Sequence, residues 1–166
     1  GGRLGKSNFA SELLSSDNIK VVKDKSCKLI LLNDKRKKIE KLTLDDINFN
    51  QIEKENNDVI IYYKSNLNEG IIGIIAARLK DYYNKPAIVI TDSGKILKGS
   101  ARSTHNYNIG RVIKNLLDRN IVINGGGHNM AAGFTLNKIY LNELKDFFLK
   151  DFAKTINIKK NVCFYD

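Results

Sequence analysis

Residues 123–134, INGGGHNMAAGF, combine residue types suited to phosphate binding in an unusual order. Three consecutive glycines weaken any helix or strand, and His128 follows them directly. Successive glycines can point several backbone N–H groups into one concavity that binds an anion. His128 can donate a hydrogen bond to a phosphate oxygen, and a helix beginning near Asn129 would add its positive N-terminal end. The residues alone leave two interpretations open: a plain glycine turn with a structural histidine, or an anion cradle at residues 125–128.

A second stretch with suitable chemistry is KGSARSTHNYN, residues 98–108. Arg102 and Ser103 lie at the end of an expected strand, and loops at strand ends are where ligands usually meet α/β sheets. Arginine offers a planar fork that matches phosphate oxygens, and serine offers a small hydroxyl donor. A solvated arginine on an edge strand is the alternative interpretation of Arg102. His105 is expected in a loop and receives no predicted role.

The sequence shows no spacing typical of a metal site or of a catalytic triad. Asp45 and Asp46 lie in a polar connection without a nearby histidine, and the chain has only two histidines. Cys27 and Cys163 form no CxxC pair, which predicts a reducing, cytosolic setting without a zinc site. The GKS at residues 5–7 lacks the upstream glycine of a phosphate-binding loop. We therefore expect a chain that holds a phosphate but does not itself cleave one.

The composition indicates one folded domain, or one and a half, with a basic surface. The chain has 166 residues, of which 42% are hydrophobic, and a formal net charge of +10. This charge favours a polyanion partner, bound with release of counterions. Compositional bias of an AT-rich genome is the alternative, and 22 lysines, 6 arginines and 20 asparagines fit it. The longest apolar run, residues 71–77, is too short to span a bilayer, and no secretory signal is visible.

The chain begins at Gly1, and its only methionine is Met130, so we expect a piece of a longer protein. Apolar periodicity predicts a layered α/β fold with a central mixed sheet, preceded by a long linker helix. The expected helices are a short one around residues 9–14 after a possible Ser7 cap, then 19–42, 69–83, 108–119 and 141–156. The expected strands are 58–63, 85–92, 95–103 and 134–136, with a further strand beginning near residue 161. Residues 43–57 are expected as a polar, partly helical connection.

GSARS followed by NGGGHNMAAGF resembles the DHH-associated domain of the DHH phosphoesterase superfamily. The wider order of GGRLGKSNFASELL, LLNDKRKKIE and NEGIIGIIAARLKDYYNKPAIVI resembles its RecJ-like single-stranded-DNA exonucleases, over about residues 1–155. The resemblance implies a domain organisation. Residues 1–16 would end a catalytic DHH domain, 17–57 would form the linker helix and connection, 58–155 the DHH-associated substrate-binding domain, and 156–166 the start of an oligonucleotide-binding fold.

The resemblance also implies a function for the whole protein: a cytoplasmic hydrolase that digests single-stranded DNA from 5′ to 3′ in DNA repair and recombination. Two Mn²⁺ or Mg²⁺ ions would be held by the catalytic domain outside this chain. This chain alone would bind no metal and show no nuclease activity. Its expected partners are single-stranded DNA and the missing domains of the same polypeptide, with no membrane. The residues implied to bind substrate phosphate are Arg102, Ser103, Gly125, Gly126, Gly127 and His128.

One departure and two alternatives accompany this resemblance. RecJ-like members often carry Trp–His just before the Gly-x-x-Gly-Ile run, where this chain has Leu67 and Asn68. Another DHH-family phosphodiesterase, acting on nanoRNA, a phosphorylated nucleotide or a cyclic dinucleotide, is the first alternative. A non-catalytic nucleic-acid-binding module, like those appended to alanyl-tRNA synthetases, is the second. The long linker helix and the strand expected after residue 160 favour the RecJ-like assignment.

Overall fold

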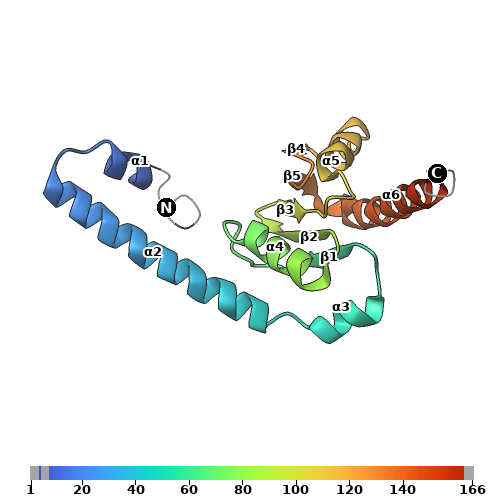
Figure 1. Cartoon of the computed structure of the whole chain (residues 1–166), viewed down its shortest axis with the longest axis horizontal. Helices are drawn as coiled ribbons and strands as arrows, with labels where there is room; N and C mark the ends of the chain where they lie inside the picture. The colour runs from blue at the N-terminus through green and yellow to red at the C-terminus, as the bar shows by residue number, and fades with distance from the viewer. Residues whose placement is uncertain (1–3, 5–7, 163–166) are drawn as a thin grey trace. The chain divides into compact units, whose positions relative to one another are not determined.

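The computed structural model describes residue 4 and residues 8–162, with side chains described through residue 156 (Figure 1). The chain divides into two compact units. The first comprises residues 1–47 and 69–71, and the second comprises residues 48–68 and 72–166. The second unit contains a five-stranded sheet.

The first unit is built on α1 (Phe9–Leu14) and the long α2 (Ile19–Asp45). The two helices contact each other, and Lys25 of α2 forms an ion pair with Glu12 of α1. Asn18 begins α2, because its side chain accepts hydrogen bonds from the N–H groups of residues 20 and 21, at 3.0 and 3.3 Å. Both helices were predicted, but Asn8 occupies the N-cap position of α1. The expected Ser7 cap and the GKS segment lie outside the described residues.

The second unit alternates strands and helices, as the apolar periodicity predicted. Its elements are α3 (Phe49–Glu55), β1 (Ile60–Tyr63), α4 (Ile72–Tyr83), β2 (Ala87–Ser93), β3 (Ile96–Arg102), α5 (Ile109–Asp118), β4 (Asn124–His128), β5 (Ala131–Asn137), a 3₁₀ turn η1 (Lys138–Tyr140) and α6 (Leu141–Val162). The strand order is β1-β2-β3-β5-β4. β1 runs parallel to β2 and the other neighbours are antiparallel, so the expected mixed sheet is confirmed.

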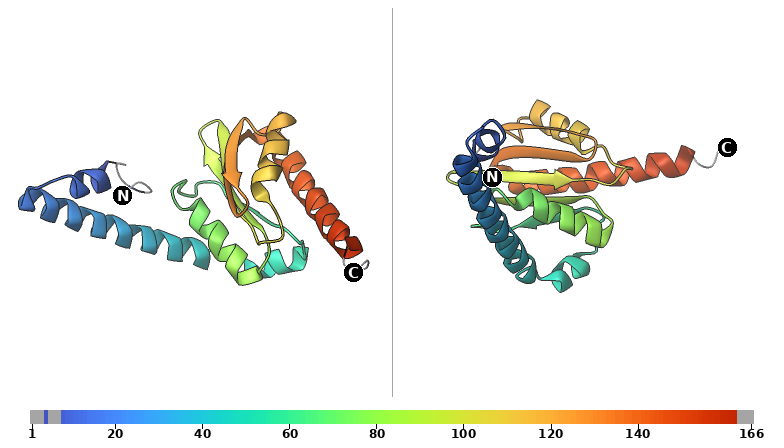
Figure 2. Two further views of the ribbon diagram at one scale, coloured as in Figure 1. Left: turned by 45° about the horizontal axis from the view of Figure 1, so that its top comes forward. Right: turned by 60° about the vertical axis from the view of Figure 1, so that its left-hand side comes forward.

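Helices cover the two faces of this sheet unequally (Figure 2). α5 and the first half of α6 cover one face, where Val112, Phe134 and Phe148 belong to a continuous buried core. α4 lies on the opposite face, mainly against β2 and β3, and buries Ile75 and Leu79 there. Within this unit, β5 and the edge strand β4 are therefore left largely uncovered on the α4 side. This partly open side of the sheet positions the candidate site.

Asparagines begin and end several helices of this unit. Asn48 and Asn108 accept N-cap hydrogen bonds from the third residue after each of them, at 3.1 and 3.0 Å. Asn56, Asn84 and Asn120 adopt left-handed φ values of 44°, 50° and 58° just after α3, α4 and α5. Asparagine tolerates this conformation better than most residues. The asparagine-rich composition thus has a structural use, whatever its genomic origin.

Two local predictions are wrong. The helix expected near Asn129 does not form, because residues 124–137 make a β-hairpin of β4 and β5. The strand expected from residue 161 is helical at residues 161 and 162, since α6 continues to Val162, and residues 163–166 lie outside the described part.

Cys27 is an exposed free thiol. Within the described residues, no helix has both the length and the apolar character needed to cross a bilayer.

Candidate nucleic-acid interface

The strand register brings the two predicted phosphate-binding stretches onto one face of the sheet. Residues directly opposed on antiparallel neighbours project to the same side. Three rows of residues therefore cross β3, β5 and β4 on the α4 side, and we call these nine residues the three-row patch. The rows are Arg102–Ala131–His128, Ser100–Gly133–Gly126 and Lys98–Thr135–Asn124. Sequence reasoning had treated the two stretches separately, and the hairpin unites them.

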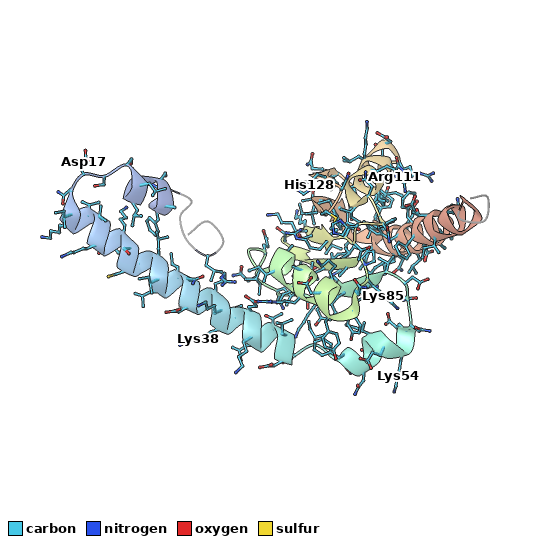
Figure 3. All side chains as sticks on the ribbon, viewed as in Figure 1. Asp17, Lys38, Lys54, Lys85, Arg111 and His128 are labelled. Atoms are coloured by element: carbon cyan, nitrogen blue, oxygen red, sulfur yellow. The ribbon has the colours of Figure 1, made fainter. Side chains whose placement is uncertain are left out.

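Arg102 and His128 occupy the two ends of the first row. Neighbouring strands are about 4.8 Å apart, so the Cα atoms of these two residues lie about 10 Å apart with Ala131 between them. His128 is exposed (Figure 3). The guanidinium of Arg102 is half-buried, and its Nη1 donates to Ser100 Oγ at 3.2 Å and to the carbonyl of residue 101 at 2.8 Å. These bonds hold the arginine fork in one orientation.

Gly73 of α4 makes room for this arginine. A Cβ at Gly73 would lie 2.9 Å from Arg102 Nη2 and 3.0 Å from Ser100 Oγ, so the arginine fork would have to shift. Ser100 was missed by the sequence analysis, although it lies two residues before Arg102 in a strand. Side chains two apart in a strand share a face, and that period is the signal that finds it. The structure thus adds a hydroxyl to the predicted set.

Ser103 has surroundings different from those of Arg102. Its side chain is buried, with 1% exposure, and its Oγ donates to the carbonyl of Tyr107 at 2.6 Å. Its backbone N–H donates to the carbonyl of Met130 at 2.9 Å. Ser103 therefore anchors the segment after β3 to the hairpin turn, and its direct contact with substrate stays a prediction.

The turn of the hairpin consists of Asn129 and Met130. Two-residue hairpin turns usually need positive φ values, and neither residue has one. Neighbouring backbone instead holds this turn, because Ile109 N–H donates to the carbonyl of Asn129 at 3.2 Å and Ser103 N–H to that of Met130. We call residues 103–109 the clasp. The clasp fixes the end of β4 from which His128 projects.

The three consecutive glycines lie in an extended edge strand, and none has a left-handed φ. These glycines therefore form no turn, and the binding of an anion by residues 125–128 stays a prediction. Packing explains two of the glycines. A Cβ at Gly125 would lie 2.7 Å from Ile113 Cγ2 of α5, and one at Gly127 would lie 2.3 Å from the carbonyl oxygen of Ala131.

The remaining glycine of the run has no such neighbour. A Cβ at Gly126 would meet no described atom within 4 Å, and one at Gly133, directly opposite, would meet only the carbonyl oxygen of Gly99 at 3.9 Å. Both glycines are exposed. The middle row of the patch is thus bare backbone, open to a ligand.

A shallow groove of about 360 Å³ continues from this bare row toward the third row. Its walls are mostly apolar. The lining residues are Ile72, Lys98, Gly99, Asn124, Gly125, Gly133, Phe134 and Thr135. The groove therefore begins at the middle row and extends away from the row that carries Arg102 and His128, on the same face of the sheet.

A buried tyrosine lies on the other side of the clasp. The ring of Tyr107 is 1% exposed and contacts Phe152 of α6 edge-on, with centroids 4.9 Å apart. Its hydroxyl has no hydrogen-bond partner within the described part of the chain. Burial raises the pKa of Tyr107 above its ordinary value, the Asp151 carboxylate raises it further, and Arg111 partly opposes the rise. Arg111 and Asp151 form an ion pair at 2.9 Å that joins α5 to α6.

No group of three or more histidine, cysteine, aspartate or glutamate side chains among the described residues is arranged to hold a metal ion. The residues of the three-row patch supply hydrogen-bond donors and cations, which suit an anion and do not suit Mn²⁺ or Mg²⁺. The patch is thus suited to binding an anion.

Comparison with known proteins identifies the family of this chain. Residues 56–157 match the model of the DHHA1 domain. The chain belongs to the DHHA1 domain family. It is 32% identical over 155 residues to the single-stranded-DNA-specific exonuclease RecJ of Haemophilus influenzae, covering 89% of this chain and 27% of that protein. It is also 32% identical to RecJ of Bacillus subtilis, covering 87% of this chain and 20% of that protein.

Solved structures show the same fold. RecJ of Thermus thermophilus in complex with Mn²⁺ has a TM-score of 0.80 and 24% identity, covering 92% of this chain and 22% of that chain. The predicted resemblance to RecJ exonucleases and the predicted fold class are both confirmed. The chain spans 20% to 27% of the length of these two curated relatives.

Proposed function

We propose that the three-row patch holds the sugar–phosphate backbone of single-stranded DNA, in a RecJ-like 5′→3′ exonuclease whose metal site lies outside this chain. The bare middle row carries this proposal. Gly126 and Gly133 have no packing reason to be glycine, and a glycine surface lets a ligand backbone approach closely. This surface lies beside Arg102 and His128, which suit phosphate oxygens. Similarity to single-stranded-DNA-specific exonucleases over 155 residues supports the substrate class.

The six predicted residues take different parts in this proposal. Arg102 presents its guanidinium to a phosphate, and His128 donates to the same phosphate or to its neighbour. Gly126 leaves space for the backbone of the strand. Gly125 and Gly127 keep β4 close to α5 and β5, and Ser103 holds the hairpin turn. Ser100 joins them, since its hydroxyl orients Arg102 on the same face.

Cleavage itself belongs to the rest of the enzyme. RecJ of Thermus thermophilus has been solved with Mn²⁺ and with Mg²⁺, which supports a divalent-metal reaction in the full protein. Such ions supply an activated water and neutralise phosphate charge. We expect the 166-residue chain alone to bind single-stranded DNA and to release no nucleotides. Manganese-dependent release of nucleotides by the purified chain would contradict this division.

Substitution of the clamp residues tests the proposal. His128→Ala and Arg102→Ala should each weaken binding of single-stranded DNA by about 2 kcal/mol, the order expected for a lost charge-assisted hydrogen bond. Fluorescence anisotropy with a labelled oligonucleotide measures this loss. The exposed His105 and Arg119 provide matched controls, and His105→Ala and Arg119→Ala should retain wild-type affinity.

The same experiment separates the alternatives. Competition by unlabelled single-stranded DNA, transfer RNA and dinucleotides ranks the possible ligands. Stronger competition by transfer RNA would assign a structured-RNA module, and stronger competition by dinucleotides would assign a small-substrate phosphodiesterase. Unchanged affinity in both His128→Ala and Arg102→Ala would remove the three-row patch from the binding site altogether.

A further inference from the structure

We infer that the groove between the middle and third rows seats one nucleoside of the bound strand, with its base lying on the backbone of Gly99 and Gly133. This inference rests on the proposed function and extends it from the phosphate backbone to the base. Its occupant is a nucleoside within single-stranded nucleic acid. The shape of the groove, its apolar walls and the charges at its two ends carry the inference.

Cationic side chains occur at both ends of the floor. Residues in one strand that share a face are about 6.7 Å apart, so the first and third rows are separated by about 13 Å. Arg102 and His128 lie in the first row and Lys98 in the third, with only glycine and Ser100 in the row between. The middle row offers no charged side chain to a phosphate, so an uncharged part of a strand can lie against it while phosphates contact the cationic rows.

The walls suit a flat apolar group. Ile72, at the start of α4, lines one side, and the backbone of Gly99 and Gly133 lines the floor. Asn124 and Thr135 line the groove at the third row and carry its polar side-chain atoms, together with Lys98. Nucleobases bind proteins through their flat faces with little sequence preference, which fits a groove that offers few polar groups. An apolar peptide would match the walls but would bring no phosphate to the cationic rows.

Comparing ligands with and without bases tests directly whether the groove binds a base. The probes are a short thymidine oligonucleotide and its abasic counterpart, which has the same number of phosphates. The wild-type chain should bind the thymidine oligonucleotide about tenfold more tightly, the order expected from one base contact. Gly133→Val fills the floor, so it should bring this affinity ratio close to one by lowering the thymidine affinity much more than the abasic affinity.

Ser93→Val is the matched control. Ser93 lies on the same face of the sheet, on β2, and does not line the groove. This variant should keep both affinities. Gly126→Ala is a second test variant, because its new methyl group would meet no described atom within 4 Å and should not disturb folding. It should also lower the ratio, and thermal unfolding of each variant verifies that the fold is intact.

The outcomes separate this inference from the function on which it rests. A wild-type ratio near one, or a wild-type ratio retained by both folded glycine variants, overturns the nucleoside seat. Equal weakening of both oligonucleotides by Gly133→Val also overturns it, since the groove would then hold backbone alone. His128→Ala should weaken both oligonucleotides to the same degree. If it weakens neither, the proposed function fails, whatever the ratio is.

Discussion

At the scale of single residues, the glycine run separates into positions required by the fold and one position that the fold does not need. We predict that Gly127→Ala destabilises the chain by about 2 kcal/mol, because its Cβ would lie 2.3 Å from a backbone carbonyl oxygen. Gly126→Ala should be neutral or stabilising by about 0.5 kcal/mol, since it only restricts the unfolded chain. Urea unfolding of the two variants measures both changes. Equal destabilisation would show that Gly126 is also packed.

Tyr107 gives a second prediction at this scale. Its pKa in the folded chain is raised above the unfolded value of about 10, so the folded state retains the proton more strongly. The contribution of Tyr107 to the free energy of unfolding is fully present below about pH 10 and is lost as the pH rises further. Tyr107→Phe removes this dependence, and it should cost little at neutral pH because the hydroxyl lacks a hydrogen-bond partner within the described residues.

The measurement is the free energy of unfolding of both proteins between about pH 8 and pH 11. The difference should be constant up to about pH 9 and should then grow in favour of the phenylalanine variant. Tyr82, which is 68% exposed, provides the control, and Tyr82→Phe should follow the wild type. A difference that stays constant across the whole range would contradict the assigned burial of the Tyr107 hydroxyl.

At the scale of elements, the sequence predicted the helices and strands that bury an apolar face, and it missed the edge hairpin. β2 and α5 were expected within about two residues of their observed bounds, because each carries a clear apolar period. β4 has all five residues exposed, so it leaves no alternating apolar signal. Its glycines are required by α5 and β5, which are distant contacts that local reasoning does not reveal. The Asn129–Met130 turn is likewise held by the clasp and not by its own residues.

The clasp supplies the prediction for this scale. Ser103→Ala removes the hydroxyl that donates to the buried Tyr107 carbonyl, which should cost about 1–2 kcal/mol of stability. Amide hydrogen exchange should quicken at Ser103 and Ile109, whose N–H groups hold the turn. Ser103→Thr keeps the hydroxyl and is the control. Faster exchange confined to residues far from the hairpin would contradict the role of the clasp.

At the scale of the whole molecule, the net charge of +10 is an ambiguous sign of nucleic-acid binding, because it consists mostly of lysines spread along the chain. Some of the cationic side chains are already ion-paired with carboxylates, as Arg36 is with Glu40 at 2.7 Å. The positions of the charged side chains are therefore more informative than their number. Arg102 lies beside a bare glycine row, whereas Lys37 and Lys38 are exposed on α2 within the run DKRKKIEK.

Salt dependence distinguishes a local contact from a general basic surface. Each phosphate contact on a single strand contributes about 0.7 to the slope of log K against log salt. Arg102→Gln should therefore reduce this slope by about 0.7 and weaken binding at every salt concentration. The double variant Lys37→Gln/Lys38→Gln removes more charge but should leave slope and affinity unchanged, if that run is a solvated helix face. Titrations between low and physiological salt measure both slopes. A larger reduction in the lysine variant would mean that the basic face of α2, and not the patch, supplies the main electrostatic contact with DNA.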